Sequence, residues 1–188
     1  MSIEKQARIA VYRLLARLTI APTDKTLLDG LSSIANKGES QEGGVDSEFR
    51  RLSETAAQAD LMLLTDEFDR LFTGLGGSEL SPYYSYYETG FLMEKPLARL
   101  RTDLKRLGFQ RQDGNNDPED HISAVSEVMA LLIEEDRPEQ RDFFHHHVSP
   151  WFGRFFADLE SGTAEPFYRA VAGLGSAFMQ DENMFYSR

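Results

Sequence analysis

The balance of aliphatic residues constrains this chain more than any other feature of its sequence. Leu and Ala together number 38, whereas Val and Ile together number only 12. Leu and Ala favour helices, while β-branched residues favour strands. Apolar residues also recur at helical spacing, and strand-like alternation is scarce. The sequence therefore predicts an all-α fold, and a length of 188 residues fits a single compact helical domain over 1–188.

The expected helices follow from this spacing and from capping residues. The first covers residues 3–18, with an apolar face made of Ile3, Ala7, Ala10, Val11, Leu14, Leu15 and Leu18. Asp24 is the predicted N-cap of a second helix, whose inward residues are Leu27, Leu28, Leu31 and Ile34. Further helices are expected over 47–72 with a break near Asp60, 96–108, 117–135, 139–159 with a break at Pro150, and 166–179. Residues 37–46 are a predicted loop, and 78–95 a loop with a short helical piece.

The charge balance excludes one class of partner and favours another. Twenty Lys and Arg face 31 Asp and Glu, for a net charge of -11. Nucleic acid is excluded because binding it requires basic residues that neutralise phosphates. A cationic peptide or protein is a better partner, since opposite charges speed the encounter of two molecules. An acidic surface can also serve solubility alone. The N-terminus lacks an apolar signal-peptide core, and no segment reaches the roughly 20 apolar residues of a membrane span, so we expect a cytoplasmic protein.

No residue pattern points to catalysis, a cofactor or a metal. The chain has no cysteine, which excludes thiolate metal sites and a cysteine nucleophile. The consecutive His145, His146 and His147 would point about 100° apart around a regular helix, so they could not share one ion. We expect one of them to be buried and two to be solvated, with no metal bound. The segment Gly74-Leu75-Gly76-Gly77 lacks the Lys-Ser or Lys-Thr of a phosphate loop and is interpreted as a helix terminator.

Four tyrosines fill five positions in the segment Ser81-Pro82-Tyr83-Tyr84-Ser85-Tyr86-Tyr87. A core seldom accepts four adjacent tyrosines, because each buried hydroxyl needs a hydrogen-bond partner. We expect some of them to line a surface or groove that binds a peptide, since tyrosine offers a large contact area at low entropic cost. The alternative is an aromatic mini-core beneath a long loop.

The segment Asp117-Pro118-Glu119-Asp120-His121 has the pattern of a helix start. Asp117 fits the N-cap, Pro118 the first helical position, and Asp120 the capping-box position that reaches back to the cap. His121 has no part in that arrangement, and a histidine beside an aspartate forms a polar, titratable site. The pair is therefore interpreted either as a helix start only or as a contact for a peptide amide or a cationic side chain.

Four segments in order give the chain a family resemblance. They are Glu67-Phe68-Asp69-Arg70-Leu71-Phe72, the tyrosine segment 81–87, Pro118-Glu119-Asp120-His121 leading to Glu127-Val128-Met129, and an H-x-x-P-W element in Phe144-His145-His146-His147-Val148-Ser149-Pro150-Trp151. With these segments the chain resembles the TorD/DmsD/NarJ redox-enzyme maturation chaperones, over about residues 3 to 180.

The resemblance implies a helical cytoplasmic chaperone that is not an enzyme. Such chaperones bind the twin-arginine leader peptide of an apo-molybdoenzyme, or its core, and hold the enzyme back from export until the molybdenum cofactor is inserted. The peptide-binding residues carried over are Tyr83, Tyr84, Ser85 and Tyr86 of the aromatic segment, and Asp120 and His121. The client enzyme and the oligomeric state, a monomer or a homodimer, stay open.

Two other classes of function stay open on the residues alone. The chain could be a helical adaptor for an unrelated partner, without a signal-peptide role. It could also be an enzyme that uses His121 as acid or base with Asp120 orienting it, although the sequence shows no nucleophile, metal motif or phosphate loop.

Overall fold

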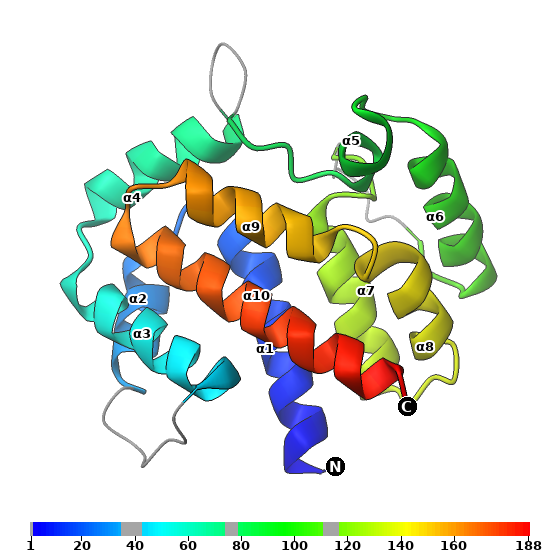
Figure 1. Cartoon of the computed structure of the whole chain (residues 1–188), viewed down its shortest axis with the longest axis horizontal. Coiled ribbons are helices and arrows are strands. Elements are labelled where there is room, and N and C mark those ends of the chain that lie inside the picture. Colours follow the sequence, from blue (N-terminus) through cyan, green and yellow to red (C-terminus); the bar gives the residue numbers. More distant parts are fainter. Residues whose placement is uncertain (1, 35–42, 74–78, 111–116) are drawn as a thin grey trace. The chain divides into compact units, whose positions relative to one another are not determined.

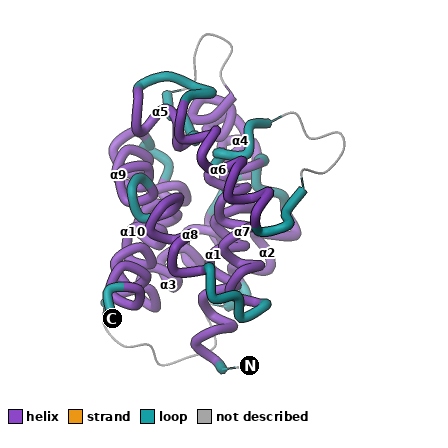
Figure 2. The backbone as a smooth tube through the Cα atoms, turned by 90° about the vertical axis from the view of Figure 1, so that its right-hand side faces the viewer, coloured by secondary structure: helices purple, strands orange, loops and turns teal. Residues whose placement is uncertain are grey.

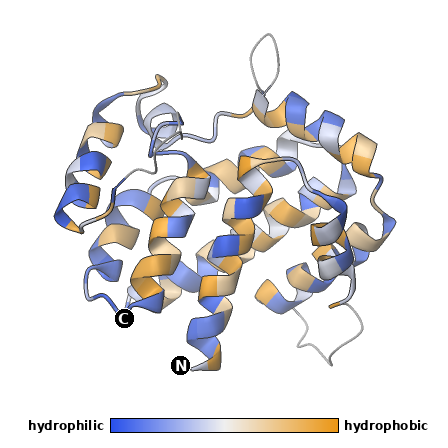
Figure 3. Cartoon of the chain, turned by 180° about the vertical axis from the view of Figure 1, so that it is seen from behind, coloured by the Kyte–Doolittle hydropathy of each residue, from blue (hydrophilic) through white to orange (hydrophobic). Residues whose placement is uncertain are grey.

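The structure, a computed structural model, describes residues 2–34, 43–73, 79–110 and 117–188, and every regular element in them is a helix (Figure 1, Figure 2). Most of these helices carry both hydrophobic and hydrophilic residues, as amphipathic helices do (Figure 3). The predicted all-α fold is confirmed. No helix in the described ranges combines the length and the apolar character needed to cross a bilayer.

Contacts divide the chain into two compact units, each assembled from two separate stretches of sequence. Unit 1 contains Met1–Arg17 and Ser81–Trp151, and unit 2 contains Leu18–Leu80 and Phe152–Arg188. The predicted extent of a single domain, 1–188, stays a prediction.

Unit 2 is organised around the long C-terminal helix α10 (Pro166–Tyr186), which packs against α3 (Gly44–Gln58) and α9 (Phe152–Gly162). Its other elements are α2 (Lys25–Ser32), α4 (Leu61–Phe68) and the π-helical turn η1 (Asp69–Thr73). A Cβ at Gly175 would overlap the ring of Phe156, so a glycine at this position lets α10 approach α9 closely.

The Glu67–Phe72 segment, noted in the sequence, has a structural role in unit 2. The Arg70 guanidinium binds Glu67, at 2.7 Å through Nη2, and donates to the Gly162 carbonyl at 2.7 Å. Thr163 Oγ1 also donates to Glu67. This network joins the end of α4 to the connection between α9 and α10.

Unit 1 contains α5 (Tyr84–Thr89), α6 (Lys95–Arg106), α7 (Ile122–Glu134), α8 (Gln140–Phe143) and the π-helical turn η2 (Phe144–Val148). Helix α5 packs on α6, and α7 packs on α8 and η2. Most of α1 (Ile3–Ile20) also belongs to this unit. Arg13 of α1 pairs with Glu134 at 2.7 Å, and Lys5 pairs with Asp136 at 2.6 Å.

Several predicted boundaries are confirmed because they depend on local signals. Asp24 caps α2 by accepting from the Leu27 amide at 2.9 Å. The break near Asp60 exists, and Asp60 caps α4. A short helix lies within 78–95, and the helix predicted over 96–108 is α6. The break at Pro150 is present as well.

Other predictions need correction. The helix predicted from 117 starts at Ile122, and the one predicted over 139–159 contains a π-helical turn before the break. The buried face of α1 is rotated: Ile3, Ala7 and Ala10 are exposed, whereas Ile9, Tyr12 and Ala16 are buried. Ile34 is exposed too. The helix terminator at 74–77 and most of the loop at 37–46 lie outside the described residues, and the end of that loop is already part of α3.

Candidate functional site

The aromatic segment and the segment before α7 lie against each other in unit 1. Tyr83 and His121 form an isolated antiparallel bridge. The Tyr84 amide donates to the Asp120 carbonyl at 3.0 Å, and the Ile122 amide donates to the Pro82 carbonyl at 2.8 Å. The two segments that the sequence singled out separately are therefore one structural feature.

Asp120 caps α5 from outside that helix. Tyr83 occupies the N-cap position of α5 without a side-chain cap bond. Instead, Asp120 Oδ2 accepts from the Ser85 amide at 2.9 Å and from Ser85 Oγ at 2.5 Å. An N-cap side chain normally makes this bond to the second or third helical residue. The capping-box role predicted for Asp120 in α7 is thus wrong, because its carboxylate serves the other segment.

Asp120 and Ser85 are both buried, with 1% and 0% of their surface exposed. The second carboxylate oxygen of Asp120, Oδ1, is also buried and finds no hydrogen-bond partner among the described residues. This arrangement makes Asp120 a positioning group for α5.

His121 is the N-cap of α7, a role the sequence analysis assigned to Asp117. Its Nδ1 accepts from the Ser123 amide at 3.1 Å. The bridge to Tyr83 requires His121 to be extended, with φ -64° and ψ 139°, so the helix cannot begin earlier. The Tyr83 ring also meets the imidazole edge at a centroid distance of 5.1 Å. Burial lowers the pKa of His121 to about 4, against the opposing effect of Asp117 and Asp120.

This pKa predicts that acid weakens the fold through His121. The unfolded imidazole has an ordinary value of 6.5, so it binds a proton first as the pH falls. The folded protein therefore has its full stability above pH 6.5, where His121 is neutral in both states. The free energy of unfolding falls by up to roughly 3 kcal/mol as the pH drops from 6.5 toward 4. His121→Asn keeps a good N-cap and removes the titration. Urea melts at each pH measure the free energy of unfolding of wild type and variant. Below pH 6.5 the wild type should lose stability relative to the variant. A constant difference from pH 7 to pH 4 would contradict this.

The H-x-x-P-W element forms an aromatic cluster with the tyrosine segment. Trp151 is fully buried and stacks on Tyr84 at 5.8 Å between ring centroids, with 11° between the planes. Trp151 Nε1 donates to the His147 carbonyl at 2.8 Å, which explains the four-residue spacing of the motif. His147 Nε2 in turn bonds Asp103 Oδ2 of α6 at 2.8 Å. Burial lowers the pKa of His147, although Asp103 opposes the shift.

The three consecutive histidines all lie within η2. His147 is buried whereas His145 and His146 are exposed, which confirms the predicted division into one buried and two solvated histidines. In the described parts of the chain, no group of three or more His, Cys, Asp or Glu side chains is arranged to hold a metal ion. The expectation of no bound metal remains a prediction.

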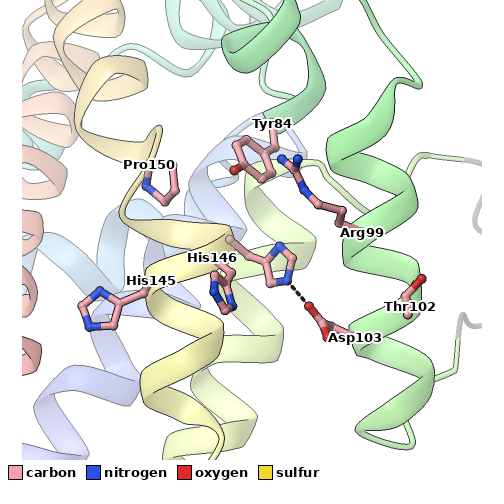
Figure 4. A pocket seen from close by; sticks show the side chains of 8 residues that line it. Tyr84, Arg99, Thr102, Asp103, His145, His146 and Pro150 are labelled. Atoms are coloured by element: carbon pink, nitrogen blue, oxygen red, sulfur yellow. Dashed lines mark hydrogen bonds and ion pairs between the residues drawn. The ribbon is translucent and has the colours of Figure 1, made fainter.

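A cavity of about 470 Å³ lies beside this cluster. Figure 4 shows Arg99, Thr102 and Asp103 on α6 along one side, and His145, His146 and Pro150 along the other. The Arg99 guanidinium lies next to Tyr84. Burial and Glu88 raise the pKa of Tyr84 to about 12, with Arg99 opposing. Among the predicted site residues, Tyr84 is the one that lines this cavity.

The six predicted site residues differ in their access to a partner. Five of them lie at the junction, where the tyrosine segment pairs with the segment before α7: Tyr83, Tyr84, Ser85, Asp120 and His121. Tyr84, Ser85, Asp120 and His121 are buried, Tyr83 is half-buried, and Tyr86 is exposed. Sequence reasoning missed the contributions of Asp103 and Arg99. Trp151 and His147 stand out in the sequence only as part of the H-x-x-P-W element, and no local signal in α6 marks Asp103 as their neighbour.

Comparisons with known proteins cover this site. A family model described as nitrate reductase delta subunit matches residues 40–157, which include the tyrosine segment, Asp120, His121 and the H-x-x-P-W element. Chaperone protein TorD of Actinobacillus succinogenes is 26% identical over 145 residues, or 76% of this chain and 74% of that protein. The Tat proofreading chaperone DmsD of Salmonella typhimurium is 30% identical over 115 residues, or 59% of this chain and 56% of that protein.

A solved structure shows the same fold. It is a crystal structure of an Archaeoglobus fulgidus protein assigned to redox enzyme maturation. The two structures have a TM-score of 0.58 and 19% sequence identity, over 97% of this chain and 95% of the other. The helical arrangement of this chain is therefore an established fold.

Proposed function

We propose a function for this chain because it belongs to the nitrate reductase delta subunit family. It is a redox-enzyme maturation chaperone rather than an enzyme, as the relatives named TorD and DmsD are chaperones. Its partner is accordingly a subunit of a redox enzyme. In finer detail, the chaperone binds the twin-arginine leader peptide of an apo-molybdoenzyme in the cytoplasm and holds the enzyme until the molybdenum cofactor is inserted.

The junction of the aromatic segment with Asp120 and His121 supports the leader-binding proposal. The resemblance to the chaperones assigns peptide binding to both segments, and here they share backbone hydrogen bonds. An apolar stretch of the leader can be met by aromatic side chains. Its basic residues can be met by a chain with a net charge of -11. An adaptor without a signal-peptide role remains the second candidate.

Co-purification with a candidate client separates the two functions. The client is a molybdoenzyme catalytic subunit whose preprotein carries a twin-arginine leader. It is made with its leader, without its leader, and with both leader arginines replaced by Gln. We expect capture of the full preprotein and at least a tenfold loss when the leader is removed. Equal capture without the leader would place recognition in the mature enzyme, and no capture of any form would favour the adaptor. Light scattering on the same samples tests the predicted monomer or homodimer.

A further inference from the structure

The negative charge of this chain is concentrated in unit 2. The residues of that unit, 18–80 and 152–188, contain 17 Asp and Glu but eight Lys and Arg. Unit 1 contains 14 acidic and 12 basic residues and is therefore close to neutral. Opposite charge attracts a basic partner to unit 2 more strongly than to the aromatic segment in unit 1.

At the start of α4, exposed apolar side chains lie beside acidic ones. Met62 and Leu63, in the first turn of this helix, are 70% and 54% exposed. Asp66 and Asp69 follow Met62 by four and seven residues, so they lie along the same side of the helix. Both aspartates are exposed.

Glu165 brings another carboxylate to α4. It precedes α10 in the connection that Arg70 and Thr163 join to the end of α4 (Figure 1). Burial, together with the charges of Glu67 and Asp60, raises the pKa of this half-buried carboxyl group. Glu165 is therefore close enough to α4 for the carboxylates there to act on it. We call Met62, Leu63, Asp66, Asp69 and Glu165 the α4 surface.

The carboxylates of the α4 surface are not neutralised within the fold. In the described parts of the chain, Asp66, Asp69 and Glu165 form no salt bridge. Arg70 is already held by two other glutamates, and Arg169 donates to a backbone carbonyl at 3.0 Å. Residues 60–70 and 158–169 together contain seven acidic and two basic residues. The charge that would attract a basic partner therefore lies at this surface.

The apolar side chains limit the kind of partner further. Leu63 lies three residues after Asp60 and four before Glu67, so carboxylates flank it along the helix. A segment with basic residues next to apolar ones matches this arrangement. Two exposed apolar side chains supply far less than the roughly 800 Å² that each partner buries in a stable complex, so a short peptide segment fits better than a second copy.

We infer that the α4 surface binds the arginine-containing region of the client leader. Its carboxylates meet the guanidinium groups, and its two apolar side chains meet the residues beside them. A guanidinium suits this surface because its planar fork of N–H donors matches carboxylates. The inference rests on the proposed chaperone function and gives the basic part of the leader a contact surface of its own.

The test compares a charge variant of the α4 surface with a matched control. The surface variant is Asp66→Asn, Asp69→Asn and Glu165→Gln, and Asn at 69 keeps an acceptor for the Thr73 hydroxyl. The control removes three exposed charges from other helices of unit 2 and changes the net charge equally: Asp46→Asn, Glu54→Gln and Asp181→Asn. Both triple variants should melt within about 2 °C of wild type, since these exposed or half-buried carboxylates have no salt-bridge partner to lose.

The probes are a synthetic twin-arginine leader peptide and a version with Gln for both arginines, titrated by fluorescence anisotropy. In about 50 mM salt we expect the surface variant to bind the leader about tenfold more weakly than wild type, and the control within about twofold. In about 500 mM salt the loss should shrink to about threefold or less, because exposed charges are screened. The Gln peptide should bind wild type and surface variant equally, within about twofold, since it has no guanidinium group.

A second pair of variants tests the apolar contact. Met62→Gln with Leu63→Gln should weaken leader binding about fivefold at both salt concentrations, because apolar burial is not screened by salt. The control is Ile3→Gln with Met184→Gln, which changes two exposed apolar residues on other helices and should bind like wild type.

Several outcomes would overturn the inference while the proposed function stands. In one, all variants bind the leader like wild type. In another, the surface variant and its charge control lose affinity equally, so that the charge acts only by long-range attraction. In a third, the surface variant loses as much affinity for the Gln peptide as for the leader. A dimer in light scattering that Met62→Gln with Leu63→Gln converts to a monomer would make the partner a second copy. If wild type binds neither peptide, the inference and the leader-binding function both fail.

Discussion

Trp151→Ala should lower the free energy of unfolding by about 4 to 5 kcal/mol, the upper part of the range for truncating a buried large aromatic side chain. Trp151 is 0% exposed and fills the space between Tyr84, Tyr87 and η2. The change removes the stack on Tyr84 and leaves the buried His147 carbonyl without the indole donor at 2.8 Å. Both losses act at the junction that supports α5.

Trp151→Phe provides the matched comparison. Phenylalanine keeps an aromatic face for Tyr84 but cannot donate to the His147 carbonyl, so we expect a cost of about 2 kcal/mol from the lost bond and volume. Urea melts followed by circular dichroism at 222 nm measure both variants, because fluorescence would lose its one Trp. In thermal melts the Ala variant should unfold roughly 10 °C or more below wild type. A cost below about 1.5 kcal/mol for Ala would show that the cluster is not part of the stabilising core.

The features predicted from the sequence are those with a local cause. Asp24 and Asp60 accept hydrogen bonds from amides two or three residues further along the chain. Pro150 has no amide hydrogen, so it cannot continue the helix before it. Such signals need no knowledge of the rest of the fold. The tyrosine segment was singled out for a physical reason too, since four neighbouring tyrosines are hard to bury together.

The features that sequence reasoning missed depend on partners far along the chain. Asp120 has a capping-box spacing, but its carboxylate meets Ser85, 35 residues earlier, and the bridge to Tyr83 then delays α7 to Ile122. The apolar spacing of α1 predicts an inward Ile3 and does not include Tyr12, whereas Ile3 is exposed and Tyr12 is fully buried. Which side of an amphipathic helix is buried depends on what packs against it. The role of Asp103 depends on η2, a π-helical turn with no sequence signature.

These distant contacts change the meaning of the predicted site. Residues expected to touch a peptide, such as Asp120 and Ser85, lie beneath the surface, and the exposed residues are Tyr86 and its neighbours at the end of α5. Most of the predicted residues therefore support α5 and the start of α7 from inside the fold, and Tyr86 is the one among the six that is fully exposed.

Asp120→Ala should destabilise the chain by about 4 kcal/mol. It removes two charge-assisted acceptor bonds, to the Ser85 amide and to Ser85 Oγ, and it leaves both buried donors unpaired. Asp120→Asn retains one acceptor oxygen at the same position, so its cost should be about 1 to 2 kcal/mol. Urea melts measure both, and Ser85→Ala completes a double-mutant cycle. Because Asp120 and Ser85 share these bonds, the double variant should be more stable than the sum of the two single losses implies.

Peptide affinity of the same variants separates positioning from contact. If Asp120 only supports α5, Asp120→Asn should bind the leader peptide within about twofold of wild type, since one acceptor still holds Ser85. Asp120→Ala should bind more weakly, and binding should recover when a saturating peptide or lower temperature restores the fold. If Asp120 touches the peptide directly, the Asn variant should instead lose tenfold or more of its affinity at a temperature where it is fully folded. That result would refute the positioning role, because a buried carboxylate held by Ser85 can lose its charge without changing the exposed surface above it.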